Sequence, residues 1–332
     1  MSSANPGDAP TSAADAALGR LAAVTGGNGF IGRWLVPELA RRGWRVRLLL
    51  RRDPVVPEWQ HLRPEIVAGA LEDPAALENL VAGATAIIHV AGLIKAATRR
   101  RFFEVNCEGA SALAQAARAT APGAHFLLVS SLAAREPAIS DYAASKRAGE
   151  SAVREAFGPR VTILRPPVVY GPGDRESLRF FQLARHRYVP VPGPAEARAA
   201  LIHVQDLVRL IAALAATEPM GTVLAAADAR PRGYRRDEIL GAAARAVGND
   251  SPRLLRAPAV LLRAVAMAGD VARLFGSAAM LNSQKLRELR HADWSVAEED
   301  LARPPGWAPE FDLQNGFADA VAWYRRAGWL PA

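Results

Sequence analysis

Cysteine is nearly absent from this chain, which has one, Cys107, among its 332 residues. A single thiol excludes any disulfide framework within the chain and suits a reducing compartment. The six histidines show none of the spacings with which proteins bind zinc, so no metal site is expected. The Gly-x-Ser-x-Gly turn of the α/β-hydrolases is also missing. We therefore expect a cytoplasmic protein that uses neither metal nor serine-hydrolase chemistry.

Long apolar runs are missing as well. The most apolar stretch, 254–281, is interrupted by three arginines and one aspartate, which predicts an amphipathic helix rather than a membrane span. Residues 1–19 are rich in Ser, Ala, Pro and Asp and have neither a basic start nor an apolar centre. This composition predicts a disordered tail and not a signal peptide.

Lysine is the third scarcity, because only three of the 41 basic residues are lysines. The arginines that make up the rest give a net charge of +8, but they are scattered, with small clusters such as those at 51–52 and 99–101. Such an arginine excess, together with abundant alanine, is typical of a GC-rich genome. No basic stripe alternates with aromatic residues, so nucleic acid is not expected as a partner.

Strand and helix patterns alternate over the first half of the chain. Strands are expected at 21–25, 45–50, 65–67, 86–90, 125–130 and 161–164, and helices at 30–42, 74–81, 101–120 and 142–157. This alternation predicts an α/β fold with a doubly wound parallel Rossmann sheet.

Proline and glycine become frequent after residue 165, and helical patterns dominate from residue 228 onward. We expect a dinucleotide-binding domain over 20–173, to which 201–227 returns with a helix and an edge strand. Residues 174–200 and 228–332 are expected to form a smaller, mostly helical substrate-binding lobe.

The most informative motif is the glycine loop of residues 26–32. Gly26, Gly29 and Gly32 follow a predicted strand and open a predicted helix. Glycines there permit a tight turn and a close approach of the backbone to a pyrophosphate, and the helix N-terminus offers N–H groups to the phosphates. The loop predicts dinucleotide binding, with a purely structural glycine turn as the alternative.

The end of the second strand bears on the choice between NAD and NADP. An acidic residue there usually binds the NAD ribose, whereas this strand ends in Leu50-Arg51-Arg52-Asp53. An arginine pairs well with a 2′-phosphate, which favours NADP. Two solvated arginines, with Asp53 serving an NAD ribose, remain the alternative.

A candidate catalytic set follows the fifth strand. Tyr142 and Lys146 are four residues apart, which places both side chains on one helix face. A tyrosine becomes an effective acid or base when a neighbouring ammonium favours its phenolate. Ser131 ends an apolar strand, where a hydroxyl would hold a substrate oxygen or, alternatively, would only cap a turn.

These motifs occur in the order of a known family. They are Thr25-Gly-Gly-Asn-Gly-Phe-Ile-Gly32, His89-Val-Ala-Gly92, Val105-Asn106, Ser130-Ser131, Tyr142-x-x-x-Lys146, Arg165-Pro-Pro-Val-Val-Tyr-Gly-Pro-Gly173 and His203-Val-Gln-Asp206, then Gly306-Trp-Ala-Pro309 and Val321-Ala-Trp-Tyr324. Residues from about 21 to 330 resemble the extended short-chain dehydrogenase/reductases, the group named for NAD-dependent epimerases and dehydratases.

The resemblance implies roles for individual residues. Tyr142 would be the acid/base, Lys146 would bind the nicotinamide ribose and lower the pKa of the tyrosine, and Ser131 would orient the carbonyl. Asn106 would support the site from its helix. The implied cofactor contacts are Gly26, Asn28, Gly29, Phe30, Ile31, Gly32, Arg51, Leu71, Val90, Ala91, Ser130, Pro166 and Val169. Arg51 is preferred to Arg52 because residues 43–51 resemble those of plant-type flavonoid reductases.

Two departures from the family pattern matter. An aspartate often faces the adenine in a Gly-Asp-Leu sequence, where this chain has Gly69-Ala70-Leu71. The Leu71 backbone or Asp73 is the substitute that we expect. Dehydratases of the family carry acidic residues after the catalytic hydroxyl, but Leu132 and Ala133 follow here, which disfavours lyase chemistry.

The resulting expectation is an NAD(P)(H)-dependent oxidoreductase that interconverts a carbinol and a ketone. The substrate would be a small molecule, either a lipid-like ketone or a nucleotide sugar. A nucleotide-sugar epimerase or reductase and a non-catalytic accessory or assembly subunit are the alternatives. By resemblance we also expect a homodimer, formed by the apolar faces of helices 101–119 and 142–157. These faces carry Phe102, Val105, Leu113 and Ala117 on the first helix and Ala144, Ala148 and Val153 on the second.

Overall fold

The computed structural model describes residues 19–52, 56–191, 193–194, 196–274 and 282–331. The predicted disordered tail therefore lies outside the described residues, apart from Gly19. None of the helices in these ranges is long and apolar enough to cross a membrane.

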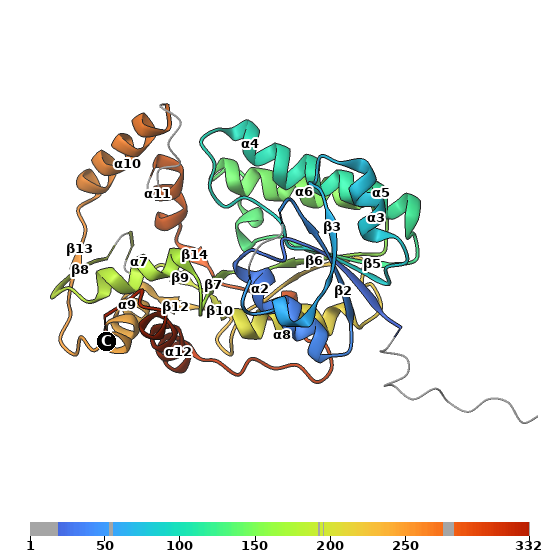
Figure 1. The fold of residues 1–332 in the computed structure, drawn as a ribbon. Coiled ribbons are helices and arrows are strands. Elements are labelled where there is room, and N and C mark those ends of the chain that lie inside the picture. The colour runs from blue at the N-terminus through green and yellow to red at the C-terminus, as the bar shows by residue number, and fades with distance from the viewer. Residues whose placement is uncertain (1–18, 53–55, 192, 195, 275–281, 332) are drawn as a thin grey trace, which may run out of the picture.

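Seven parallel strands form the central sheet, in the order β11-β6-β5-β4-β1-β2-β3 (Figure 1). Their bounds are β1 Leu21–Thr25, β2 Arg45–Leu50, β3 Glu65–Ala68, β4 Ala86–His89, β5 His125–Val129, β6 Val161–Arg165 and β11 Val223–Ala225. The strand order changes direction between β1 and β4, which is where doubly wound sheets bind their ligands. The predicted parallel Rossmann fold is confirmed.

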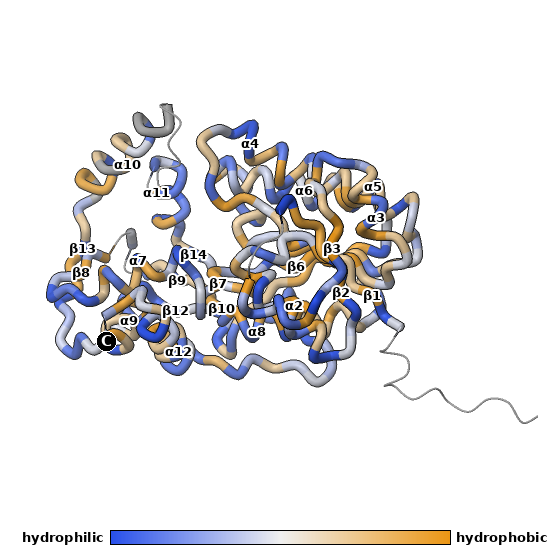
Figure 2. The backbone as a smooth tube through the Cα atoms, in the orientation of Figure 1, coloured by the Kyte–Doolittle hydropathy of each residue, from blue (hydrophilic) through white to orange (hydrophobic). Residues whose placement is uncertain are grey.

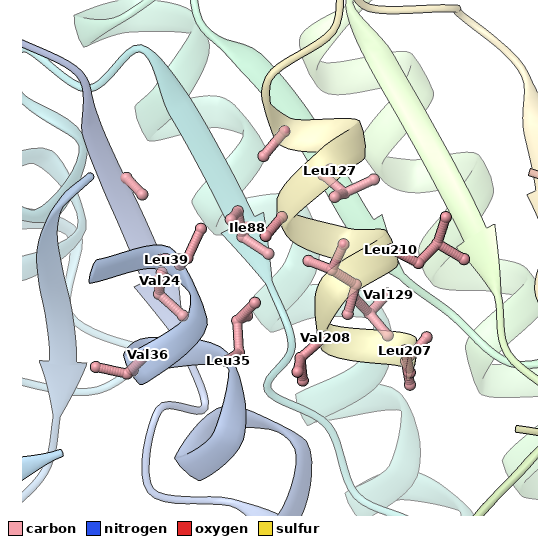
Figure 3. Packing of buried hydrophobic residues seen from close by; sticks show 14 of the residues in the cluster. Val24, Leu35, Val36, Leu39, Ile88, Leu127, Val129, Leu207, Val208 and Leu210 are labelled. Carbon is pink, nitrogen blue, oxygen red and sulfur yellow. The ribbon is translucent and has the colours of Figure 1, made fainter. Parts of the chain in front are cut away.

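Helices cover both faces of this sheet, so hydrophobic residues gather along its strands (Figure 2). On one face lie α2, Phe30–Arg41, and α8, Val204–Ala215; on the other lie α3, Pro74–Val81, α5, Gly109–Thr120, and α6, Asp141–Phe157. Figure 3 shows Leu35 of α2 near Val24 of β1, and Leu207 of α8 near Val129 at the end of β5, within one buried cluster. Successive strand residues point to opposite faces, so every position of β1, β4 and β5 is buried.

The single helix expected over 101–120 is interrupted. Residues Arg99–Phe103 form α4, Glu104–Glu108 form one π-helical turn and α5 follows. Single π-helical turns are frequent at functional sites, because the extra residue changes the direction in which a side chain points. Asn106 occupies this turn.

Part of the apolar faces expected to pair two subunits lies inside this chain. Phe102, Leu113, Ala117 and Val153 are buried, and the last three pack beneath the sheet, so these four side chains are not at a subunit interface. The other expected residues, Val105, Ala144 and Ala148, are half-buried. The homodimer itself stays a prediction.

The C-terminal lobe is built on α7, Arg175–Ala184, α9, Arg236–Ala246, and α12, Leu313–Arg326. These helices surround a cluster of buried rings that includes Tyr170, Phe181, Phe317 and Tyr324. The helices α10, Ala259–Leu274, and α11, Ser283–Arg290, stand at one side of this lobe (Figure 1).

Short strands add to this lobe and to its junction with the sheet, which the helical pattern of the sequence did not indicate. They are β7 Val168–Tyr170, β8 Tyr188–Val191, β9 Arg198–Ala199, β10 Leu201–His203, β12 Tyr234–Arg235, β13 Arg253–Arg256 and β14 Asp293–Trp294. Single 3₁₀ turns lie at Gln60–Leu62 (η1), Leu132–Arg135 (η3) and Glu298–Asp300 (η4). Strands of two to four residues are too short to show an alternation of apolar and polar residues in the sequence.

The close approach of Gly149 on α6 to the backbone of the π turn gives a test of the fold. A Cβ atom on Gly149 of α6 would lie 2.1 Å from the carbonyl oxygen of Asn106, whereas one on Gly241 of α9 would lie 3.5 Å from its nearest neighbour. We expect Gly149→Ala to lower the free energy of unfolding by about 1–3 kcal/mol through overpacking. The control Gly241→Ala should leave it unchanged or raise it by up to about 1 kcal/mol.

Urea unfolding at equilibrium measures both changes. A Gly149→Ala protein as stable as its parent would show that α6 does not need this close approach.

Candidate active site

The glycine loop closes tightly over the end of the sheet. Gly26 has a φ of +76°, and a Cβ there would lie 2.7 Å from the backbone nitrogen of Ala91. A Cβ on Gly32 would lie 2.0 Å from the carbonyl oxygen of Gly26. Gly29 begins α2 and no side chain caps the helix, so the N–H groups of its first turn stay available to a phosphate. These residues fit a dinucleotide pyrophosphate.

Side chains from three segments hold this loop in place. Trp59 donates a hydrogen bond from Nε1 to the carbonyl oxygen of Gly27 at 3.0 Å. Thr25 Oγ1 lies 2.7 Å from His89 Nδ1 and accepts a hydrogen bond from the Ala91 backbone. Burial lowers the pKa of His89 to about 3, so this histidine is neutral and serves as a structural partner. The ends of β1 and β4 are thereby tied together.

The predicted adenine and ribose contacts lie around this loop. Asn28 is exposed at its tip, while Phe30 and Ile31 are half-buried in the first turn of α2. Arg51 is exposed at the end of β2 and makes no hydrogen bond or ion pair with another described residue. Asp53, the alternative ribose partner, lies outside the described residues. The half-buried Leu71 lies beside the position of Gly109 on α5.

The remaining predicted cofactor residues follow the ends of β4 and β6. Val90 and Ala91 follow β4 and are half-buried, as is Val169 in β7. Pro166 is buried and its carbonyl oxygen accepts a hydrogen bond from Leu132. Contact of these residues with a cofactor stays a prediction.

The structure brings the three predicted catalytic residues together. Ser131 caps the 3₁₀ turn η3 directly after β5, and its hydroxyl shares a hydrogen bond with that of Tyr142 on the first turn of α6. Lys146 lies one turn further along α6 and donates from Nζ to the carbonyl oxygen of Val129 at 2.9 Å. Ser131 is thus both a capping residue and the partner of the tyrosine.

Burial sets the protonation of this group. It raises the pKa of Tyr142 to about 12, against the opposing effect of the hydrogen bond from Ser131. It lowers the pKa of Lys146 to about 8, although Glu150 pulls that value upward. At neutral pH the site therefore holds a neutral phenol and an ammonium, which suits proton donation by the tyrosine.

A buried ion pair that the sequence analysis missed lies behind the catalytic residues. Glu150 on α6 accepts from Arg165 Nε at 2.8 Å and from the hydroxyl of Ser130. The hydroxyl of Ser130, a predicted cofactor residue, is therefore directed at Glu150. The signal was present, because Tyr142, Lys146 and Glu150 continue a four-residue spacing along one helix face. Nothing in the sequence pointed to Trp59.

Asn106 supports the site from the π turn, as the family resemblance implied. Its side chain accepts from the Leu93 backbone at 2.8 Å and donates to the Leu93 carbonyl oxygen and to Ser145 Oγ, both at 3.0 Å. Because Ser145 precedes Lys146, this one amide joins the loop after β4 to the catalytic helix.

The buried lysine gives a prediction that needs no substrate. Between pH 8 and 10.5 the unfolded chain keeps the proton on Lys146 that the folded chain has released, so the free energy of unfolding should rise with pH. We expect Lys146→Met to remove roughly 2–3 kcal/mol of this rise in the cofactor-free protein. The control is Lys95→Met, whose partly exposed ammonium pairs with Glu176.

Urea denaturation at a series of pH values measures the difference between each variant and the parent. Parallel curves for the parent and Lys146→Met would show that the ammonium is not desolvated.

Comparisons with known proteins show the family of this chain. The sequence profile of the NAD dependent epimerase/dehydratase family matches residues 22–225. A protein of Caulobacter vibrioides named ceramide reductase is 49% identical over 311 residues, which cover 93% of this chain and 96% of that protein. Sterol demethylase protein B of Methylococcus capsulatus is 28% identical over 352 aligned positions, covering 92% of this chain and 99% of that protein.

The fold is shared with solved enzyme structures. The dTDP-glucose 4,6-dehydratase DesIV of Streptomyces venezuelae, solved with NAD, superposes with a TM-score of 0.71. The two sequences are 23% identical, and the match covers 94% of this chain and 99% of that one. With the glycine loop and the catalytic helix in place, the match to the family profile shows that this chain belongs to the NAD-dependent epimerase/dehydratase family of extended short-chain dehydrogenase/reductases and is an NAD(P)-dependent enzyme.

Proposed function

We propose that this enzyme reduces the ketone of a ceramide-like lipid to a carbinol, with NADPH as the hydride donor. The observation that carries the proposal is the hydrogen-bonded pair of Ser131 and Tyr142, with Lys146 one turn away. The name of the 49% identical Caulobacter protein supports a ceramide-like substrate. We place the reaction in the cytoplasm, where the single cysteine would stay reduced.

Each residue of the site has its own role in the proposed reaction. When bound, the nicotinamide supplies the hydride that reaches the carbonyl carbon. Tyr142 donates its phenolic proton to the ketone oxygen, and its pKa of about 12 keeps that proton in place at neutral pH until it is needed. Ser131 donates a hydrogen bond to the same oxygen and orients the carbonyl. The Lys146 ammonium stabilises the phenolate that is left.

A nucleotide sugar is the second candidate substrate. A hollow of about 760 Å³ lies between η3 and the lobe, and Arg135, Arg198 and Arg232 are among its lining residues. Arginines of this kind suit a diphosphate, but four carboxylate side chains line the same hollow and weaken its attraction for anions. Leu132 and Ala133 supply no acid for a dehydration. Parallel assays with UDP-glucose and with a ceramide-like ketone distinguish the two substrates.

Removal of the phenolic hydroxyl tests the chemistry. Tyr142→Phe keeps the ring and should lower kcat by about two to four orders of magnitude, the usual effect of losing a positioned acid. NADPH affinity should change little. The assay follows NADPH consumption with a short-chain ceramide analogue that carries a ketone in place of the carbinol. Activity within about threefold of the parent would remove tyrosine catalysis from this proposal, whereas absence of turnover in the parent itself would favour a non-catalytic accessory subunit.

The exposed arginine after β2 tests the cofactor. We expect NADPH to bind about tenfold more tightly than NADH, because Arg51 is free to pair with the 2′-phosphate. Arg51→Ala should abolish this preference. Arg52→Ala, the neighbouring exposed arginine, should preserve it and serves as the matched control. Titration calorimetry gives the affinities of the three proteins for both cofactors; equal values for the two cofactors in the parent would exclude NADP selectivity.

A further inference from the structure

Helix α10 exposes large apolar side chains on its outer side. Val260, Leu261 and Met267 are 77%, 59% and 64% exposed, and Ala264 and Ala268 between and beside them are exposed too. These five residues, the outer face of α10, follow helical spacing and form one continuous strip. Figure 2 shows hydrophobic colours along α10, which stands at the edge of the molecule away from the sheet. Water-facing strips of this kind mark binding surfaces.

The opposite side of α10 is already occupied. Ala266 is buried at 1% exposure, and the carboxylate of Asp270 accepts hydrogen bonds from the backbone and the hydroxyl of Ser283 at the start of α11. The outer face is therefore held outward by the packing of α10 on α11.

Three arginines flank the strip. Arg253 and Arg256 of β13 and Arg263 of α10 are exposed, and none of them forms an ion pair with a described residue. No acidic residue occurs between 253 and 268. Leu255, which is 51% exposed, adds an apolar side chain between the first two arginines. The surface thus combines exposed apolar side chains with unpaired positive charge.

We propose that the outer face of α10 and its three arginines dock this enzyme on the surface of an anionic lipid bilayer. An amphipathic helix that lies in the interface buries its apolar side chains among the acyl chains, while its arginines pair with lipid phosphates. A second copy of this chain fits less well, because a two-fold contact would bring the same arginines face to face. The 16-residue helix is too short to span the hydrocarbon layer.

The docking surface is connected to the active site through α11. The Gln284 side chain accepts a hydrogen bond from the Asp141 backbone N–H and donates one to the Asp141 carboxylate at the start of α6, directly before Tyr142. Arg287 donates to the Ile139 carbonyl oxygen. A bilayer bound at α10 would therefore adjoin the part of the lobe that touches the catalytic helix. The inference goes beyond the proposed reaction and does not depend on it, since binding to vesicles is measured without any substrate.

Vesicle flotation tests the proposal with the full-length protein. We expect it to float with vesicles of phosphatidylcholine and phosphatidylglycerol, to float poorly with phosphatidylcholine alone, and to be released by sodium chloride. Replacement of Arg253, Arg256 and Arg263 by Gln should lower the partition coefficient by about two orders of magnitude. Replacement of Val260, Leu261 and Met267 by Ser should lower it by about tenfold or more.

Control variants show whether a loss of binding comes from this surface or from a general change in charge or hydropathy. Arg118→Gln with Arg154→Gln removes exposed charge from α5 and α6, and Ile66→Ser with Met220→Ser removes exposed apolar side chains elsewhere. These variants should float like the parent. Absence of flotation, equal loss in the controls, or a doubled mass that falls to the monomer value in the serine variant would each overturn the proposal. The last outcome would assign the face to a second copy.

Discussion

Close backbone packing at the end of β1 is the constraint on which the rest of this structure depends. Gly26 leaves no room for a side chain against Ala91, and Gly32 leaves none against Gly26. The N-terminus of α2 can therefore sit directly over the sheet edge, where a helix offers N–H groups and partial positive charge to an anion. The hydrogen bond between Thr25 and His89 fixes the neighbouring β4 end in the same arrangement.

Ser131, Tyr142 and Lys146 are held by the same sheet, on the β4 side of the point where the strand order changes direction. Strand β5 ends at Val129, Ser131 follows it at the start of η3, and α6 returns across the sheet with Tyr142 and Lys146 facing that end. Desolvation raises the pKa of Tyr142 and lowers the pKa of Lys146 from their ordinary values. The buried pair of Glu150 and Arg165 lies behind them and keeps a negative charge near the lysine ammonium.

The C-terminal lobe contacts the catalytic helix α6 through α11, and these contacts link the site to the exposed helix α10. Helix α11 touches the first residues of α6, and α10 packs on α11 with its apolar outer face turned to solvent. A lipid substrate and a bilayer docking surface are compatible in such an arrangement, because the substrate would come from the layer on which the enzyme rests. One fold can serve many substrates, so the fold alone does not select the substrate.

The sequence by itself determined the parallel sheet, the glycine loop and the Ser131, Tyr142 and Lys146 set, because period, turn chemistry and four-residue spacing are local properties of a chain. Only the tertiary structure decided what depends on residues far apart in sequence. It placed Trp59 against Gly27, turned Ser130 toward Glu150 and buried Leu113 inside the subunit instead of at its surface. Burial and pairing depend on the whole packed chain, so the helical spacing could place Glu150 on the face of Tyr142 and Lys146 but could not name its partners.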